Sequence, residues 1–473
     1  MIAENFERFL KHIEACALEF SKIPHSETIR VVSHLDCDGI TSAAIIIKAL
    51  NRMNRKYALS VVQQLDEKQI YALSREDYKN FVFTDIGSGQ ISRLTEALSG
   101  RRIFILDHHE TEGAKSERLF HINPHCFEID GSNNISGAGV VFLFARALDQ
   151  KNEDLAHLAI IGAIGDVQEE NGFSEINSFI LSIAEKKGKL LRKKGLRIFG
   201  TQSRPIHKLL EQSSDFVING VTGSESGAVQ FLQSIGVSPT DNNGRWRKLS
   251  ALSESEMQRL VTALILARGG EENPESIIGD TYILPDEKED SVFRDAKEFS
   301  TLLNACGRMG RASFGIGACL GDVRAKQQAL NTLAEYKKEI TRALRWYEAN
   351  KDIAIRGENF LVINAGGNVS PTIIGTMSSI IAKSGELKPG TLIIAMAQNY
   401  DGTTKISARV AGNGRAPDID LRELLKRIIG NSEGEAGGHK NAAGAVIPTS
   451  KEADFINSAI SILQQMALEE KIN

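Results

Sequence analysis

The residues best suited to metal binding or catalysis lie in the segment SHLDCDGITSA (33–43), between an apolar run and a helix-like one. This segment places His34, Asp36 and Asp38 within five positions. Carboxylates so close together repel each other, and burial raises their pKa values further. A divalent cation between them would reverse that cost. The segment therefore indicates metal binding, although either Asp could instead cap the following helix.

Three further segments carry the same residue types where an apolar run ends. They contain Asp85 in FTDIGSG, the run Asp107, His108 and His109 in LDHHET, and Asp166 in AIGDVQE. Taken alone, Asp85 could be a turn residue, the DHH run a chance cluster, and Asp166 a helix-end or loop residue. Because all four segments hold the same kind of position, where an apolar run ends within a single domain, we expect them to meet at one site.

A mixed set of carboxylates and imidazoles suits Mn²⁺, with Mg²⁺ as the alternative. Two such ions about 3.5–4 Å apart can clamp the attacking and leaving oxygens of a phosphoester displacement. A bridging carboxylate would hold the ions at that separation. Asp85 fits this role, because it stands alone at its own strand end.

The elements that would position these residues alternate between strand and helix. Strands are expected at 28–33, 58–63, 80–85, 101–107 and 119–123, with helices at 39–55 and 88–100. This βαβαβ order predicts a parallel sheet covered by helices. Ligands of such sheets gather at the carboxyl ends of the strands.

The rest of the chain is organised differently. Residues 173–200 are amphipathic and basic, and we expect a basic helix there that carries Lys186, Lys187, Lys189, Arg192, Lys193, Lys194 and Arg197. A solvated face is favoured for these charges over a nucleic-acid track. Short helical pieces fill 201–290, a long helix runs from about Val323 to Tyr347, and 351–473 returns to α/β alternation. The long helix is expected to bridge two domains.

Composition restricts the class of protein but not its partner. The chain has 473 residues, 42% of them hydrophobic and 25% charged, with a net charge of −4. No apolar run reaches the ~18 residues of a membrane span, and the start has no signal-peptide core. Its five Cys form no CxxC pair, which argues against a disulfide framework or a zinc site. We expect a cytoplasmic protein without a blanket basic surface.

The four segments resemble motifs I to IV of the DHH phosphoesterase superfamily in order and separation. The resemblance implies that His34, Asp36 and Asp85 hold one Mn²⁺. It implies a second ion on Asp38, Asp85, His108 and Asp166. His109 would stand beside the scissile phosphate, and Asp107 would support the His pair.

Two segments resemble parts of the DHH-associated domain. GEAGGHKNAAGAV (434–446) is interpreted as a Gly-rich loop similar to the GGGH motif, with Gly437, Gly438 and His439 as substrate-binding residues. Ala436 replaces the first Gly of that motif. KISARV resembles the strand that carries a phosphate-binding Arg, here Arg409. The alternatives are a plain turn for the Gly-rich segment and a surface ion pair for Arg409.

NACGR (304–308) resembles the NAxGR segment of RecJ nucleases, in which Arg308 would contact the nucleic acid, while Asn304 to Gly307 could serve packing alone. The whole pattern resembles archaeal RecJ-like, GINS-associated nucleases. It implies an α/β protein with a parallel-sheet DHH catalytic domain (1–200), a helical insert (201–290), the NAxGR segment with the bridging helix (291–350) and a smaller DHH-associated domain (351–473).

The implied activity is two-metal hydrolysis of single strands, 5′→3′ on DNA or 3′→5′ on RNA, in replication or repair. Single-stranded DNA or RNA and the GINS complex are the implied partners. Two alternatives stay open: a scaffold of the GINS-bound replicative helicase, and a phosphodiesterase of short oligonucleotides or cyclic dinucleotides.

Overall fold

The chain folds into two compact units, residues 1–333 and 334–473. The structure is a computed structural model that describes residues 2–113, 116–170, 172–213, 218, 220–268, 273–412, 419–430 and 434–472. Each unit has its own sheet and its own hydrophobic core. The units are therefore described one at a time.

The first unit contains a five-stranded sheet in which every neighbouring pair is parallel. The strand order is β2-β1-β3-β4-β5. The strands are β1 (Ile29–His34), β2 (Tyr57–Val62), β3 (Asn80–Thr84), β4 (Arg102–Leu106) and β5 (Leu119–Ile122). This arrangement confirms the predicted parallel sheet, and all five carboxyl ends lie at the same edge.

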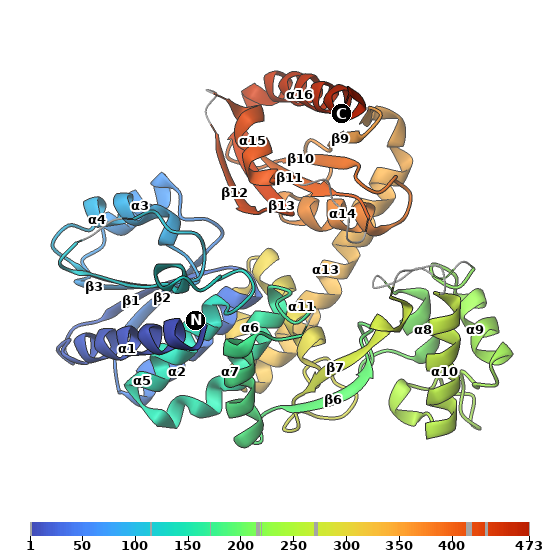
Figure 1. The fold of residues 1–473 in the computed structure, drawn as a ribbon, viewed down its shortest axis with the longest axis horizontal. Coiled ribbons are helices and arrows are strands. Elements are labelled where there is room, and N and C mark those ends of the chain that lie inside the picture. Colours follow the sequence, from blue (N-terminus) through green and yellow to red (C-terminus); the bar gives the residue numbers. More distant parts are fainter. Residues whose placement is uncertain are drawn as a thin grey trace. The chain divides into compact units, whose positions relative to one another are not determined.

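Helices cover both faces of this sheet (Figure 1). One face carries α3 (Glu67–Ser74) and α4 (Ile91–Ala97), whose apolar side chains pack on those of β1, β3 and β4. The other face carries α1 (Ile2–Ser21), α2 (Cys37–Arg52) and α5 (Gly137–Leu148). Next to them pack α6 (Ala156–Gly165) and α7 (Glu175–Lys186). Phe81 and Phe83 are fully buried, and each such side chain contributes about 1.5–3 kcal/mol of hydrophobic free energy.

The basic segment after α7 is a strand, so the prediction of one basic helix there was wrong. The helix ends at Lys186, and Gly188 turns the chain with a φ of 66°. The strand β6 (Leu191–Leu196) then pairs antiparallel with β7 (Ile278–Ile283). Helical periodicity over 173–186 was extended too far, because a left-handed residue such as Gly188 ends a helix.

The two-stranded ribbon β6–β7 leads into and out of a small helical module. It comprises α8 (Ile206–Glu211), α9 (Glu225–Ser234) and α10 (Glu254–Ala267), which share a separate hydrophobic core. The start of α10 is fixed by a capping box between Ser253 and Glu256. After the ribbon come α11 (Ala296–Arg308), α12 (Ala312–Cys319) and the expected long helix, α13 (Val323–Ala349).

The second unit is built on a six-stranded mixed sheet with the order β12-β13-β11-β10-β9-β8. The strands are β8 (Ile355–Arg356), β9 (Phe360–Asn364), β10 (Leu392–Gln398), β11 (Thr403–Val410), β12 (Glu435–His439) and β13 (Ala442–Pro448). The helices are α14 (Pro371–Lys383), α15 (Leu421–Ile429) and α16 (Glu452–Ile472). The Gly-rich segment 434–446 therefore forms the antiparallel hairpin of the edge strand β12 with β13, and its interpretation as a loop was wrong.

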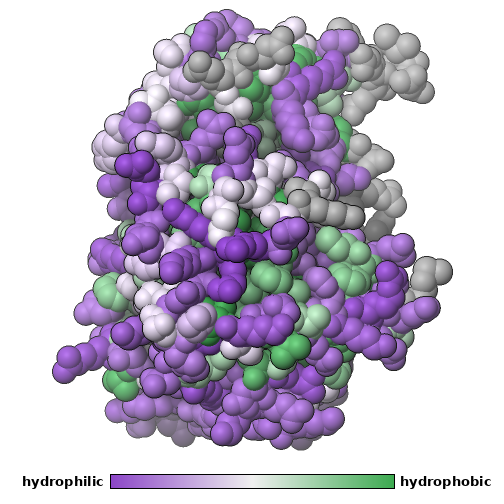
Figure 2. Space-filling view, turned by 90° about the vertical axis from the view of Figure 1, so that its left-hand side faces the viewer, coloured by the Kyte–Doolittle hydropathy of each residue, from purple (hydrophilic) through white to green (hydrophobic). Residues whose placement is uncertain are grey.

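Apolar side chains gather in the interior of each unit and of the helical module. One face of the molecule, drawn in Figure 2, is covered mainly by hydrophilic side chains with apolar ones scattered among them. Among the helices of the described ranges, none is both long enough and apolar enough to cross a membrane.

Candidate metal centre

Seven of the eight residues in the predicted metal motifs stand at, or just after, the carboxyl ends of parallel strands. His34 ends β1, Asp36 and Asp38 begin α2, Asp85 follows β3, and His108 comes two residues after β4. The remaining Asp107 and His109 flank His108. Asp166 differs, because it is the C-cap of helix α6 and not the end of a strand. Asp166 thus holds the helix-end position that the sequence left open, since the apolar run before it is a buried helix.

The first candidate ligand group joins His34, Asp36 and Asp85. The Nδ1 of His34 lies 3.0 Å from Oδ2 of Asp36 and 3.5 Å from Oδ2 of Asp85. The other oxygen of Asp36 accepts a hydrogen bond from the backbone N–H of Gly39 at 3.0 Å. Asp36 thus caps α2 with one oxygen and faces the imidazole with the other. The capping and the ligand roles of Asp36 are compatible.

The second candidate group joins Asp38, His108 and Asp166. The Nε2 of His108 lies 3.7 Å from Oδ2 of Asp38 and 3.3 Å from Oδ2 of Asp166. It also lies 3.4 Å from Oδ1 of Asp85. Oδ2 of Asp85 therefore faces the first ligand group, and Oδ1 faces the second. A third candidate group consists of Asp85, His108 and His109.

Asp85 is the most constrained of these residues. Its side chain is 1% exposed, and neither carboxylate oxygen has a hydrogen-bond partner among the described residues. Its φ of 58° lies in the left-handed region, which costs a non-glycine residue about 1–2 kcal/mol. Strain of this kind persists only where the surrounding structure enforces it. The backbone thus aims a bare carboxylate between the two ligand groups.

The donor set passes a test of fit for divalent cations. Besides Asp85, the buried Nδ1 of His34 and Nε2 of His108 lack hydrogen-bond partners within the described ranges. Buried polar atoms left in this state cost about 1–3 kcal/mol each. Cations coordinated by these atoms would satisfy them. Carboxylate oxygens and imidazole nitrogens are both common ligands of divalent cations in proteins.

Asp38 is held by the start of α5, a contact that the sequence reasoning missed. Its two oxygens accept hydrogen bonds from the backbone N–H groups of Gly137 at 2.6 Å and Ala138 at 3.0 Å. A Cβ at Gly137 would come within 2.6 Å of Oδ1 of Asp85, and one at Gly162 within 2.3 Å of Oδ1 of Asp38. The signal available in the sequence was SGAG (136–139), a Ser N-cap followed by small residues.

The electrostatics of the site show how strongly it favours added positive charge. Burial, followed by the charges of Asp85 and Asp166, raises the pKa of Asp38 well above its usual value. Burial also raises the pKa of Asp166 to about 7, and Asp36 and Asp85 contribute. Burial alone would lower the pKa of His108, yet the surrounding carboxylates raise it well above its usual value. The cluster therefore holds protons at neutral pH when no cation is bound.

His109 and Asp107 form a separate pair beside the two groups. Oδ1 of Asp107 lies 2.7 Å from Nδ1 of His109, and it accepts the backbone N–H of His108 at 2.8 Å. Its Oδ2 accepts the N–H of Ser88 at 2.9 Å. Asn123 donates from its side chain to the carbonyl of His109 at 2.8 Å. These contacts hold the ring of His109 through its Nδ1 and hold the backbone of the DHH run.

The orientation of His108 has its own supports, which sequence reasoning also missed. Its Nδ1 lies 2.8 Å from the carbonyl oxygen of Gly131, so Nε2 faces the carboxylates. The buried side chain of Gln168 donates to the same carbonyl at 3.0 Å, and Asn177 donates to Gln168 at 2.8 Å. A backbone carbonyl that binds the second ring nitrogen fixes the tautomer of a ligating His.

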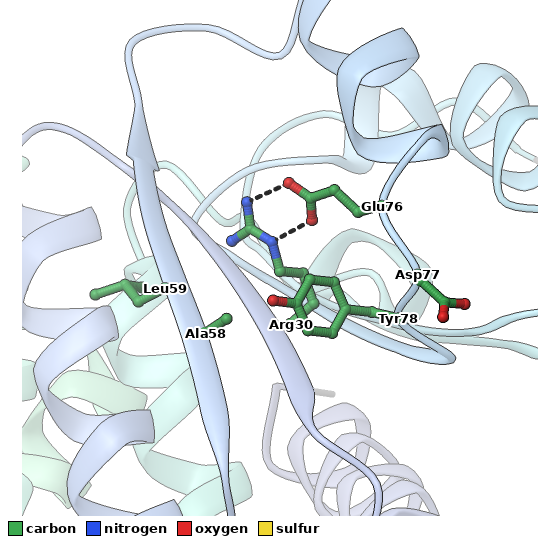
Figure 3. Close-up of a pocket in the computed structure, with 6 residues that line it drawn as sticks. All are labelled: Arg30, Ala58, Leu59, Glu76, Asp77 and Tyr78. Carbon is green, nitrogen blue, oxygen red and sulfur yellow. Dashed lines mark hydrogen bonds and ion pairs between the residues drawn. The ribbon is translucent and has the colours of Figure 1, made fainter.

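A hollow elsewhere on the first unit lacks this chemistry (Figure 3). It is lined by Arg30, Ala58, Leu59, Glu76, Asp77 and Tyr78. Arg30 stands near the start of β1, away from the motifs at the strand ends, and pairs with both oxygens of Glu76. The Arg charge is therefore already satisfied, and the strand-end cluster remains the candidate site.

The substrate-binding residues predicted for the second unit lie on β11 and β12, which are separated by β13 in the sheet. Arg409 of β11 is opposite Ala442 of β13, and Ala442 is opposite His439 of β12. Arg409 is anchored by Ser379, to which its Nε donates at 2.8 Å, and by the carbonyl of Ala408. The side chain of His439 lies outside the described part of the chain. The sheet register thus brings Arg409 and the GGH strand within two strand spacings, about 10 Å.

Gly437 is opposite Gly444 and Gly438 is opposite Ala443, so small residues face each other at these two positions of the β12–β13 pair. A Cβ at Gly437 would meet no other atom within 4 Å. Gly438 has a φ of 116°, which a residue with a side chain rarely adopts. Arg308, the remaining predicted residue, is the last residue of α11 in the first unit and is partly buried.

Comparison with known proteins connects this geometry to a family. The DHH family, N-terminal domain, matches residues 28–163, the DHH-CID domain 198–277, and the DHHA1 domain 357–465. An uncharacterised protein of Methanocaldococcus jannaschii is 30% identical over 467 residues, which cover 96% of this chain and 98% of that protein.

Two solved structures share the fold. RecJ from Thermus thermophilus in complex with Mn²⁺ has a TM-score of 0.58 and 17% identity, over 97% of this chain and 55% of that chain. CDC45 from Entamoeba histolytica has a TM-score of 0.62 and 9% identity, over 96% of this chain and 98% of that chain. This chain thus spans about half of the RecJ chain. It belongs to the DHH superfamily, with a RecJ-like combination of DHH and DHHA1 domains.

Proposed function

We propose that this protein is a metal-dependent exonuclease that hydrolyses phosphodiester bonds of single strands during replication or repair. The proposed substrate is DNA, degraded 5′→3′, with RNA as a second substrate. The observation that supports it is the bare, buried Asp85 carboxylate between the His34–Asp36 pair and the His108–Asp166 pair. A strained, unsatisfied carboxylate in that position has a clear use only when cations are bound on both sides.

Two divalent cations are proposed, with Mn²⁺ preferred over Mg²⁺ because imidazoles are among the donors. His34, Asp36 and Asp85 would hold one of them. The other would be held by Asp38, Asp85, His108 and Asp166. When bound, such a pair supplies Lewis acidity that activates water near neutral pH and stabilises charge on the phosphate.

The protein's own side chains would orient the substrate. The His109 side chain is 37% exposed, whereas those of His108 and Asp85 are 2% and 1% exposed, so a phosphate can reach His109. With Nδ1 held by Asp107, His109 would donate from Nε2 to a phosphate oxygen. In the first unit, Arg308 is a further candidate phosphate contact.

The second unit would hold the strand away from the reacting phosphate. Arg409 provides a fork of donors that suits phosphate. His439 and the backbone of Gly437 and Gly438 would bind the nucleic-acid backbone beside it. Phosphate contacts carry little sequence information, so cleavage should be largely independent of sequence.

The test uses DNA and RNA strands labelled at either end, with Mn²⁺ and Mg²⁺ compared, for the wild-type chain and Asp85→Ala. Label release from the 5′ end of DNA in Mn²⁺, lost in Asp85→Ala, is the expected result. Strands of graded length are included, because a phosphodiesterase of short oligonucleotides or cyclic dinucleotides would hydrolyse only the shortest. Equal hydrolysis by Asp85→Ala would contradict the role of this residue.

The fold shared with CDC45 over almost the full chain supports a second candidate, a partner in a replication complex that docks on GINS. Docking of this kind needs no metal. Co-purification of GINS with both the wild-type chain and Asp85→Ala, without label release by either, would favour that candidate over the exonuclease.

A further inference from the structure

We propose that Asn304 and Gly307 of α11 are positioning residues that set the geometry of the ligand segment His34–Asp38. This inference rests on the proposed function, because it concerns the cations that this segment would bind. The two residues lie about 270 positions from the segment in sequence, yet both contact its backbone directly. The contacts are of two different kinds and converge on adjacent peptide groups.

The first contact is a hydrogen bond. Oδ1 of Asn304 accepts the backbone N–H of Cys37 at 3.0 Å. Cys37 is the first residue of α2 and stands between Asp36 and Asp38. The N–H groups of a helix's first turn have no acceptor within the helix. Asp36 satisfies the N–H of Gly39, and Asn304 satisfies that of Cys37. Helix α11 therefore completes the cap of α2 from outside.

The second contact is a close approach of two backbones. A Cβ at Gly307 would lie 1.6 Å from the carbonyl oxygen of Leu35 and 2.7 Å from its carbonyl carbon. Leu35 separates the ligands His34 and Asp36. A backbone atom cannot rotate away as a side chain would, so any residue larger than Gly would displace the Leu35 peptide. That displacement would move the two neighbouring ligands.

Helix α11 is well placed for this task. It packs against α2, which carries Asp36 at its N-cap and Asp38 in its first turn, and against α6, whose C-cap is Asp166. Ala305 and Cys306, between the two positioning residues, are fully buried. The segment 304–307 thus contacts the ligand segment from a helix end at which residues 305–307 are buried. The resemblance to the NAxGR segment implied a nucleic-acid contact for Arg308 and left packing open for Asn304 to Gly307, whereas these contacts assign Asn304 and Gly307 to the metal centre.

The experiment measures Mn²⁺ affinity, by the electron paramagnetic resonance signal of free Mn²⁺, on full-length Asn304→Leu, Asn304→Asp and Gly307→Ala. Asn304→Leu and Gly307→Ala are expected to weaken Mn²⁺ binding about 10–100-fold, as is typical when residues that orient metal ligands are replaced. Asn304→Asp keeps an acceptor oxygen for the Cys37 N–H, so its affinity should stay close to that of the wild-type chain.

Two matched controls separate positioning from general packing. Gly315→Ala brings a Cβ within 3.1 Å of the Ile40 side chain of α2, a contact that the side chain can relieve. Asn152→Leu removes a buried amide that donates to the carbonyl of Ala145 at 2.7 Å. Both controls should lower the unfolding midpoint in EDTA while leaving Mn²⁺ affinity unchanged.

The outcomes distinguish this inference from the proposed function. Wild-type affinity in both Asn304→Leu and Gly307→Ala would overturn the positioning role alone. If Gly307→Ala does not fold, the comparison of Asn304→Leu with Asn304→Asp decides, and equal affinities of these two variants overturn the inference. A wild-type chain that binds Mn²⁺ but releases no label would overturn the exonuclease and leave the positioning role standing.

Discussion

The Nδ1 of His109 lies 2.7 Å from Oδ1 of Asp107, and the same carboxylate accepts the backbone N–H groups of His108 and Ser88. Burial alone would raise the pKa of Asp107, but the neighbouring His109 and His108 hold it well below its usual range. Asp107 therefore stays ionised while it fixes the ring of His109. One carboxylate thus links the DHH run to the segment after β3 and holds His109 by its Nδ1.

This relationship predicts a separation between catalysis and metal binding. His109→Ala should lower kcat for single strands about 10²–10⁴-fold, the range typical of a lost acid–base or donor group. Mn²⁺ affinity should change much less, because the other six side chains remain. Single-turnover hydrolysis and Mn²⁺ titration of the same preparation check this prediction. A loss of affinity as large as the loss of rate would instead make His109 a metal ligand.

Replacement of the Asp85 carboxylate should lower the hydrolytic activity but raise the stability of the metal-free protein. Asp85→Asn should abolish Mn²⁺-dependent hydrolysis, because the amide carries no charge for the cations. Without metal, the variant should be more stable than the wild-type chain, since it removes a buried, unsatisfied carboxylate that also raises the pKa of Asp38. Urea unfolding in EDTA and in Mn²⁺ measures both effects. Asn is chosen because it tolerates the left-handed backbone at this position.

A comparison of Asp85→Ala with Asp85→Asn isolates the backbone strain. Ala lacks a polar side chain that can hydrogen-bond locally in the left-handed region, so Asp85→Ala should be less stable than Asp85→Asn by about 1 kcal/mol in EDTA. Equal stability of the two variants would mean that the φ of 58° costs little here.

The first sheet and the ligand cluster could be predicted from the sequence, and there is a physical reason for this. Short β-branched and aromatic runs predict buried parallel strands, and the carboxyl ends of such strands meet at one edge. Contacts between distant segments leave no such periodic signal. The Asn304 contact with Cys37, the Gly137 N–H bound to Asp38, and the Gln168 support of Gly131 depend on which elements pack together.

Two local predictions failed because amphipathic or Gly-rich patterns are ambiguous. The basic run after Lys186 was interpreted as a continuation of the amphipathic helix, yet several of its charges are paired across β6–β7 or with neighbouring acids. Lys194 pairs with Asp280 at 2.9 Å, and Lys189 with Asp286 at 2.7 Å. Such pairing weakens the interpretation of this segment as a nucleic-acid track, which stays a prediction.

Replacement of Arg409 should weaken substrate binding without changing metal binding. Its guanidinium is anchored by Ser379 and by the carbonyls of Ala408 and Ala443. Arg409→Ala should raise KM for single strands and reduce the salt slope of binding by about one phosphate contact. Filter binding over a range of salt concentrations measures the slope. Arg409→Lys keeps the charge but not the fork, so it should restore the slope and only part of the affinity.

Asp295 predicts a pH dependence of stability that is independent of the metal centre. It caps α11 by accepting the N–H groups of Lys297 and Glu298, and it is 7% exposed. Burial, followed by the charge of Glu298, raises its pKa to about 7. An unfolded chain has an Asp pKa of about 3.9. Between these two pH values, the folded state holds a proton on Asp295 that the unfolded state has lost. The stabilisation by this proton is complete below about pH 3.9 and is lost as the pH rises through about 7.

Asp295→Asn keeps an acceptor oxygen for the cap but cannot ionise. Its stability relative to the wild-type chain should therefore rise between about pH 5 and pH 8, by up to about 3 kcal/mol, since each pKa unit corresponds to about 1.4 kcal/mol. Urea unfolding in EDTA at several pH values measures the difference in unfolding free energy between the two chains. The metal cluster titrates equally in both, so its contribution cancels in this difference. Asp322→Asn, which replaces an exposed Asp whose side chain accepts the N–H of Ala325 at 2.7 Å, is the matched control. Parallel stability curves for Asp295→Asn and the wild-type chain would show that Asp295 is ionised in the folded state across this range.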